Sequence, residues 1–125
     1  MALFAISDLH LDLNGEKPMD VFGENWHKHD EKLKKNWMAK IKDEDTVMIA
    51  GDISWSIKIE NGMQDLDWIH SLPGNKIMIK GNHDYWWSSI TKLNNLYDDM
   101  KFIQNNFFTY NDYAICGTRG WILPE

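Results

Sequence analysis

The sequence has very few of the residues that form cross-links or basic binding surfaces. Cys116 is the only cysteine among 125 residues, which excludes an internal disulfide and the cysteine clusters of zinc fingers and iron–sulfur sites. Arg119 is the only arginine, and 13 basic residues stand against 19 acidic ones, for a formal net charge of -6. Because a DNA-binding protein needs a basic face to neutralise phosphates, we expect no dedicated nucleic-acid surface.

Long hydrophobic runs are also missing. No apolar stretch approaches the roughly 20 residues that a membrane-spanning helix needs. The first residues, Met-Ala-Leu-Phe-Ala-Ile-Ser-Asp, lack the basic segment of a secretion signal, so we expect a cytoplasmic protein with no membrane partner. The composition, 43% hydrophobic and 26% charged, is that of an ordinary globular protein, and the length fits one domain over residues 1–125.

The apolar residues that are present predict alternating strands and helices. Uniformly apolar runs at 3–6, 47–50 and 77–79 are typical of parallel strands that are covered on both faces. Helical spacing of apolar residues predicts helices over 30–41, over 61–72 with Asn61 as N-cap, and from Ser88 or Ser89 to Met100. A hairpin with a turn at Asn111-Asp112 is expected at 107–116. This order indicates an α/β fold built from βαβ units.

Polar side chains follow each of the three predicted strands. They are Asp8 and His10 after the first strand, Asp52 after the second, and Asn82, His83 and Asp84 after the third. Since parallel strands end at one edge of a sheet, we expect these side chains to converge. Gly51 and Gly81 remove a Cβ where strand turns into loop, which lets the backbone approach a ligand closely.

This set of donors suits a metal centre. Asp8 and His10 are two residues apart, so in an extended chain both side chains point the same way and can chelate one ion. Asp52 has two carboxylate oxygens with which to bridge two ions, and Asn82 offers a neutral amide oxygen. The mixture of carboxylate, imidazole and carbonyl favours Mn, Fe or Zn.

The same residues match a known pattern. Asp8-Leu9-His10, Gly51-Asp52 and Gly81-Asn82-His83-Asp84 resemble the first three motifs of the calcineurin-like metallophosphoesterase superfamily, in order and spacing, over residues 3–118. The resemblance implies half of a four-layer α/β/β/α sandwich, with a mixed sheet, βαβ units and a C-terminal hairpin. It also implies hydrolysis of a phosphoric mono- or diester by a metal-activated water.

The resemblance further implies a role for each residue. Asp8 and His10 would bind a first ion, Asp52 would bridge, and Asn82 would bind a second ion. His83 would assist the leaving group or the transition state as a catalytic residue, and Asp84 would orient His83 through its other ring nitrogen.

Two features depart from the family pattern. Ile53-Ser54-Trp55-Ser56 follows the second motif where protein phosphatases of the superfamily have Asp-Arg-Gly, which disfavours that branch. The family's later Gly-His and Gly-His-x-His motifs do not occur, so residues 1–125 resemble a domain truncated after its first half. We therefore expect two divalent ions in a complete member and at most one well held by this chain. The alternative function is a metal-binding fragment with no turnover of its own, and self-association of such a fragment is expected.

Several aromatic and polar residues near the strand ends leave alternatives open. His27 and His29 are predicted to lie at the surface, with substitute metal ligation as the alternative. Trp55 and Trp86 fit a substrate-pocket wall as well as the core. For the remaining candidates a core position is favoured: Trp26, Trp87, Trp121 and Cys116.

Overall fold

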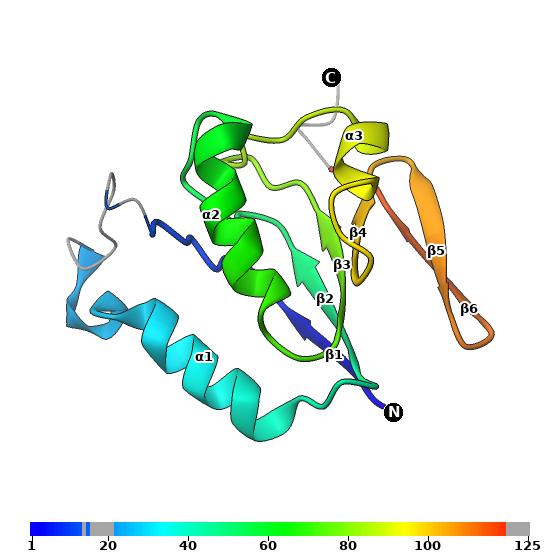
Figure 1. Ribbon diagram of the computed structural model, residues 1–125, viewed down its shortest axis with the longest axis horizontal. Helices are drawn as coiled ribbons and strands as arrows, with labels where there is room; N and C mark the ends of the chain where they lie inside the picture. Colours follow the sequence, from blue (N-terminus) through cyan, green and yellow to red (C-terminus); the bar gives the residue numbers. More distant parts are fainter. Residues whose placement is uncertain (14, 16–21, 120–125) are drawn as a thin grey trace, which may run out of the picture.

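Strands and helices alternate along the chain, as the apolar runs predict (Figure 1). The computed structural model describes residues 1–13, 15 and 22–119. In chain order the elements are β1 (Leu3–Ile6), the short 3-10 helix η2 (Glu24–Trp26), α1 (His29–Lys40), β2 (Thr46–Ala50), α2 (Ile59–His70), β3 (Asn75–Ile79), α3 (Ile90–Asn94), β4 (Met100–Ile103), β5 (Asn106–Tyr110) and β6 (Tyr113–Gly117).

The main sheet has the strand order β1-β2-β3-β4, and all of its strands are parallel. The hairpin of β5 and β6 is antiparallel and forms a separate sheet, with Tyr110 opposite Tyr113 across the predicted turn. The expected mixture of parallel and antiparallel pairing is therefore present, but it is divided between two sheets. The α/β class, the βαβ units and the hairpin are confirmed.

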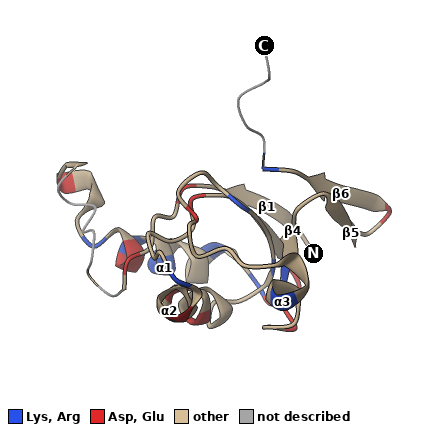
Figure 2. Ribbon diagram, turned by 90° about the horizontal axis from the view of Figure 1, so that it is seen from above, with Lys and Arg blue, Asp and Glu red and all other residues tan. Residues whose placement is uncertain are grey.

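The helices α1, α2 and α3 lie on one face of the sheet (Figure 2). Each helix connects two neighbouring strands, and because parallel crossovers are right-handed, successive crossovers in one direction place their helices on the same side. The buried core accordingly joins Trp37 of α1, Leu66 of α2 and Leu93 of α3 to residues of the sheet. The prediction that every strand is covered on both faces is wrong for β1, whose residues alternate between exposed and half-buried.

The ends of two predicted helices are also corrected. The third helix stops at Asn94, and Met100, which was predicted to end it, begins β4 instead. The Asn94 side chain pairs with that strand, since its Oδ1 accepts the Phe102 N–H at 2.7 Å and its Nδ2 donates to the Phe102 carbonyl at 3.1 Å. Ser89 is confirmed as the N-cap of α3, whereas α2 begins before Asn61, at Ile59.

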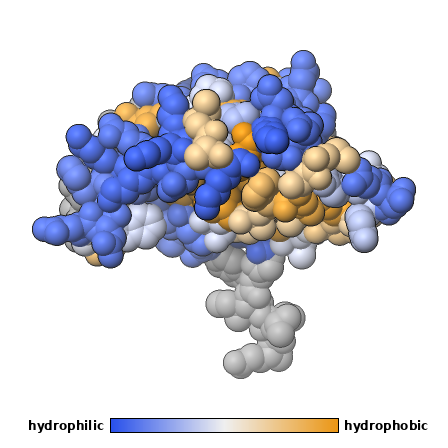
Figure 3. Space-filling model, turned by 90° about the horizontal axis from the view of Figure 1, so that it is seen from below, coloured by the Kyte–Doolittle hydropathy of each residue, from blue (hydrophilic) through white to orange (hydrophobic). Residues whose placement is uncertain are grey.

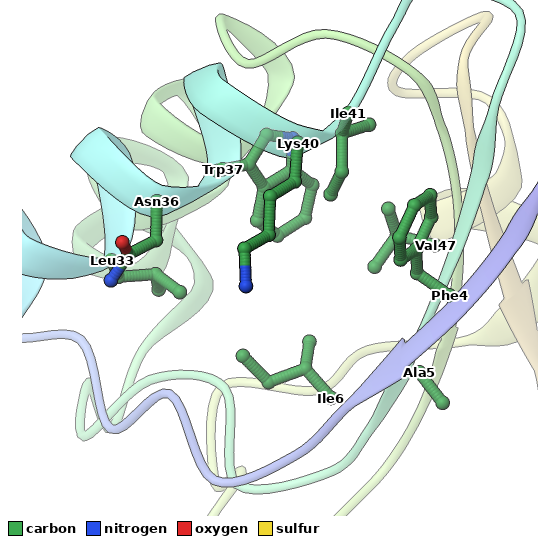
Figure 4. A pocket seen from close by; sticks show the side chains of 9 residues that line it. All are labelled: Phe4, Ala5, Ile6, Leu33, Asn36, Trp37, Lys40, Ile41 and Val47. Atoms are coloured by element: carbon green, nitrogen blue, oxygen red, sulfur yellow. The ribbon is translucent and has the colours of Figure 1, made fainter.

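A cavity of about 260 Å³ separates α1 from β1 and β2 (Figure 4). Its walls are mostly apolar, and Lys40 extends over them with its ammonium in the opening. The side chains drawn in Figure 4 include none of the predicted metal ligands. Within the described residues, no helix has both the length and the apolar character to cross a membrane.

Candidate metal centre

Donor atoms from two loops meet at the carboxyl edge of the sheet, where Figure 2 shows acidic segments side by side. Asp8, His10 and Asp52 each offer an atom, and these atoms lie within 4.8 Å of one another. Nε2 of His10 is 3.6 Å from Oδ1 of Asp8 and 3.8 Å from Oδ2 of Asp52. The convergence predicted from the strand ends is present for these three side chains.

The backbone brings Asp8 and His10 together in a way that the sequence did not reveal. Both residues were expected in an extended chain, but their φ angles are 59° and 45°, in the left-handed region, and Asp52 shares it with a φ of 48°. Such a conformation costs a non-glycine residue about 1–3 kcal/mol and persists only where the surroundings hold it. The strain in this part of the chain therefore falls on the predicted ligands themselves.

Two glycines allow the loops after β2 and β3 to touch. A Cβ on Gly51 would lie 2.8 Å from the Cα of Gly81, and a Cβ on Gly81 would collide with the amide nitrogen and carboxylate of Asp52. The predicted need for glycine at both positions is thus explained by contact between the loops. The space beside Gly81 is filled by the Asp52 side chain.

Asp52 is the most highly contacted of the predicted ligands. The backbone N–H of His83 donates to its Oδ1 at 2.9 Å, and Nδ1 of the same histidine lies 3.0 Å from Oδ2. With its amide nitrogen turned to the carboxylate, Asn82 lies 3.1 and 3.2 Å from the two oxygens. Partial burial opposes ionisation, but the hydrogen bonds from His83 and the nearby imidazoles of His83 and His10 hold the pKa of Asp52 below its usual range.

Asp84 does not orient His83, which corrects the role implied by the resemblance. Its buried carboxylate accepts the backbone N–H groups of Ile53 at 2.8 Å, Ser54 at 3.2 Å and Gly81 at 2.7 Å. It also accepts the Trp86 indole N–H at 3.0 Å, and burial raises its pKa despite these donors. Asp84 therefore ties the loop after β2 to the loop after β3, while Asp52 takes the place beside the His83 ring.

Aromatic rings surround the two imidazoles of the site. Trp55 stacks on His10 with 4.9 Å between ring centroids and an interplanar angle of 26°, and its centroid is also 4.9 Å from that of His83. Trp26 meets His10 edge-on at 6.1 Å and is only half-buried, which contradicts its predicted core position. Trp86 is a core residue with 2% exposure, Trp87 packs partly buried against that core, and Trp121 lies outside the described residues.

His29 lies close to the site without joining the donor group. Its Nε2 is 2.9 Å from the carbonyl oxygen of Leu9 and 3.1 Å from that of His10, so a proton on Nε2 is shared between the two carbonyls. His27 is exposed at the end of η2. Of the residues that the structure describes, neither histidine belongs to the group of metal-ligand atoms. The predicted surface position is confirmed for His27, whereas His29 is half-buried.

The donor set fits a divalent transition metal. Two carboxylates and an imidazole converge, and Asn82 adds an amide group directly beside Asp52. A carboxyl held ionised by its neighbours is the form that a cation binds, and a mixed O and N set suits Mn, Fe or Zn.

Comparison with known proteins agrees with this chemistry. Residues 1–123 match the sequence profile described as Calcineurin-like phosphoesterase. The chain belongs to the calcineurin-like phosphoesterase family. It is therefore a member of a family of metal-dependent hydrolases and carries a group of side chains suited to a metal ion.

Two similar proteins have longer chains than this one. The Gene 66 protein of Mycobacterium phage L5 is 37% identical over 78 residues, which are 62% of this chain and 37% of the phage protein. The crystal structure of AQ665 of Aquifex aeolicus, a protein of unknown function, matches 91% of this chain and 58% of its own with a TM-score of 0.57 and 25% identity. The chain thus spans less than two thirds of the length of either relative, in accord with half of a calcineurin-like phosphoesterase fold.

Two buried residues near the candidate metal centre were not among the predicted site residues. Ser54 is 1% exposed and Asp65 is fully buried, and they are hydrogen-bonded to each other beneath the loops that carry the predicted ligands. Asp65 sits on the same face of α2 as the buried Leu66 and Ile69. The sequence does place Asp65 among the apolar positions of this helix. An aspartate at such a position indicates a specific buried partner, because carboxylates are rarely buried without one.

Proposed function

We propose that this chain is the metal-binding half of a phosphoesterase that hydrolyses a phosphoric mono- or diester. Asp8, His10 and Asp52 would hold one divalent ion, and Asp52 with Asn82 would contribute to a second one. The observation that carries the proposal is the meeting of three donor atoms within 4.8 Å at a sheet edge, in a chain that belongs to a hydrolase family. Bound divalent ions supply an activated water and charge stabilisation for the phosphoryl group.

The other properties of the site side chains fit metal binding, proton donation and restraint of the imidazoles. Asp8 is 57% exposed, so its carboxylate reaches the open side of the loops, whereas Asp52 is 11% exposed and lies beneath. His83 uses Nδ1 towards Asp52 and is 36% exposed, which leaves Nε2 available to donate a proton to a leaving-group oxygen. Trp55 restrains both imidazoles, because it stacks on His10 and packs at a tilt against His83.

A second candidate function is metal binding without turnover by residues 1–125 themselves. In the part of the chain that the structure describes, the group of His, Cys, Asp and Glu ligand atoms consists of Asp8, His10 and Asp52. That number of donors would be enough for one ion, whereas Asp52 and Asn82 alone would hold a second ion only weakly. Under this candidate, residues 1–125 bind one ion and hydrolyse phosphoesters only at trace rates.

The environment we propose is a reducing one such as the cytoplasm. The free thiol of Cys116 is exposed on β6, and an exposed thiol survives best where disulfides do not form.

A metal titration with a matched charge control tests the site. Asp52→Asn removes a ligand charge, while Asp112→Asn makes the same change in the hairpin turn, away from the site. We expect isothermal titration of residues 1–125 with Mn²⁺ to show binding that Asp52→Asn abolishes and Asp112→Asn preserves. Equal binding by all three proteins would refute the assignment of the site.

Phosphatase assays separate the two candidate functions. A phosphomonoester and a phosphodiester substrate are offered with Mn²⁺ to residues 1–125 and to the longest natural polypeptide that contains them. We expect turnover by the longer polypeptide, and His83→Ala there should lower kcat by about 10²–10⁴-fold with little change in bound metal. Turnover of ~1–10³ s⁻¹ by residues 1–125 would exclude the candidate without turnover.

A further inference from the structure

Asp65 is a buried carboxylate that none of the predicted motifs contains. It lies in the middle of α2 and is 0% exposed. Its Oδ1 accepts the backbone N–H of Leu13 at 3.0 Å, and its Oδ2 accepts the hydroxyl of Ser54. One carboxylate therefore joins the chain after β1 to the chain after β2, which lie 41 residues apart in the sequence.

The two segments that Asp65 joins are those that carry the predicted metal ligands. Leu13 follows His10 by three residues, and Ser54 follows Asp52 by two. The segments already run side by side beyond the sheet, because the N–H of His10 donates to the Asp52 carbonyl at 2.9 Å and the N–H of Trp55 donates to the Leu11 carbonyl at 3.0 Å. Asp65 adds a link between the same two segments, through Leu13 and Ser54, at the end away from the sheet.

Ser54 connects Asp65 to the third loop of the site. The backbone N–H of Ser54 donates to Asp84 at 3.2 Å while its hydroxyl donates to Asp65, and Asp84 in turn accepts the N–H of Gly81, next to Asn82. Ser54, Asp65 and Asp84 are all at most 1% exposed. These bonds form a continuous buried path from helix α2 to the loops after β1, β2 and β3.

We propose that Asp65 is a positioning residue of the metal site, which sets the distance between the Asp8–His10 loop and Asp52 without contacting the ion. The left-handed backbone at Asp8, His10 and Asp52 needs support from outside those residues, and Asp65 supplies it to both loops. The inference rests on the proposed metal site. Residues that hold metal ligands in place typically change metal affinity or activity by 10–100-fold when they are replaced.

Substitutions of Asp65 and of its partner Ser54 remove different numbers of these hydrogen bonds. Asp65→Ala removes both acceptors and leaves the Leu13 N–H and the Ser54 hydroxyl without their bonds. Asp65→Asn keeps an oxygen for Leu13. Ser54→Ala loses the hydroxyl bond to Asp65 and the bond that the same hydroxyl accepts from the Ser56 N–H, but it leaves the Leu13 bond in place. Asp67→Ala is the matched control, since Asp67 is on the same helix but accepts a hydrogen bond from Tyr97 instead.

Mn²⁺ affinity of residues 1–125, measured by calorimetry well below the melting temperature of each variant, is the main readout. We expect Asp65→Ala to weaken binding about 10–100-fold, Asp65→Asn and Ser54→Ala to weaken it less, and Asp67→Ala to leave it unchanged. The visible absorption spectrum of bound Co²⁺ should also change in Asp65→Ala and not in Asp67→Ala, because ligand geometry is what Asp65 controls.

The results separate the two proposals. Affinity within twofold of the unsubstituted chain in Asp65→Ala would overturn the positioning role alone. Failure of the unsubstituted chain to bind Mn²⁺ would overturn the metal site and the positioning role together. Should circular dichroism show that Asp65→Ala is unfolded, unchanged affinity in both Asp65→Asn and Ser54→Ala overturns the role, and weakened affinity in either supports it.

Discussion

At the scale of single residues, the site depends on how closely the loops after β2 and β3 approach each other. Gly81 has no Cβ, and the Asp52 carboxylate fills the space where one would be. The same carboxylate accepts the His83 N–H and lies against Asn82. One added methyl group at position 81 therefore acts directly on the carboxylate that lies beside His10, Asn82 and His83.

We expect Gly81→Ala to displace Asp52 and weaken Mn²⁺ binding at least tenfold. The φ of Gly81 is not in the left-handed region, so the effect is a clash rather than backbone strain, with a loss of about 1–3 kcal/mol in the free energy of unfolding. Gly117→Ala is the control, because its Cβ would press on Ile79 and Ile103, 3.0 Å away, instead of on Asp52. Mn²⁺ titration and urea unfolding of both variants check this. Unchanged metal affinity in Gly81→Ala would contradict the expectation.

At the scale of elements, an ion pair between the buried Lys76 and the half-buried Asp99 fixes the start of β3. Lys76 is 0% exposed, and its ammonium donates to the Leu72 carbonyl and to Oδ2 of Asp99 at 2.9 Å. The N–H of Lys76 also donates to the Asp99 carbonyl at 2.7 Å. The end of α2, the start of β3 and the chain before β4 are thereby joined at the edge opposite the metal site. A lysine within an apolar run explains why the pattern predicted β3 to begin later than it does.

We expect the Asp99 carboxylate to make stability depend on pH in the acid range. Partial burial opposes its ionisation, but hydrogen bonds from Lys76 and from His70, at 2.6 Å, hold the pKa of Asp99 below the ordinary 3.8. A lowered folded-state pKa means that the unfolded chain binds more protons, so this stabilisation is complete above pH 3.8 and is lost as pH falls through the folded value. Urea unfolding between pH 2 and 6, at intervals of about one unit, should show a steeper loss for the native chain than for Asp99→Asn.

The same pair allows a simple check at neutral pH. Asp99→Ala leaves the Lys76 charge buried without its partner and should cost about 3 kcal/mol of unfolding free energy. Asp98→Ala removes an exposed carboxylate next to it and should change that free energy by less than about 0.5 kcal/mol. Equal effects of the two substitutions would show that the ion pair contributes nothing specific.

At the scale of the whole molecule, the helices cover one face of the sheet and leave much of the other face apolar. Figure 3, which views the sheet edge-on from below, shows hydrophobic residues gathered in a band that runs towards the hairpin. A cavity of about 230 Å³ between the sheet and β6 is lined almost entirely by apolar side chains, including Met48, Ile79 and Ile115. Cys116, predicted to be buried, is exposed here. Such surfaces favour association.

We expect residues 1–125 to self-associate through this face. Met48→Lys places a charge on the face, whereas Met38→Lys makes the same change on α1, where the methionine is 57% exposed on the helix side. Sedimentation velocity at micromolar concentration should show species larger than a monomer for the native chain and for Met38→Lys, and mainly monomer for Met48→Lys. A native chain that sediments as a compact monomer would contradict this.

Local sequence patterns were enough to predict the first three strands, the hairpin and the edge where the site lies. Apolar runs bounded by glycine and polar residues specify strands, and parallel strands bring their carboxyl ends to one edge whatever the details of packing. The candidate ligands Asp8, His10 and Asp52 could therefore be found, and the family with them, because their positions relative to the strand ends are a property of the chain order.

The tertiary structure decided which partner each polar group takes and where β4 begins. Asp84 was predicted to contact His83, but it binds N–H groups of two loops, and Asp52 lies beside the His83 ring instead. Asp65 joins segments that are far apart in the sequence, and Asn94 pairs with Phe102 within β4, the strand that helical spacing had concealed. Short-range spacing carries no information on such bonds, because they depend on how separate loops pack and on which buried donors remain without an acceptor.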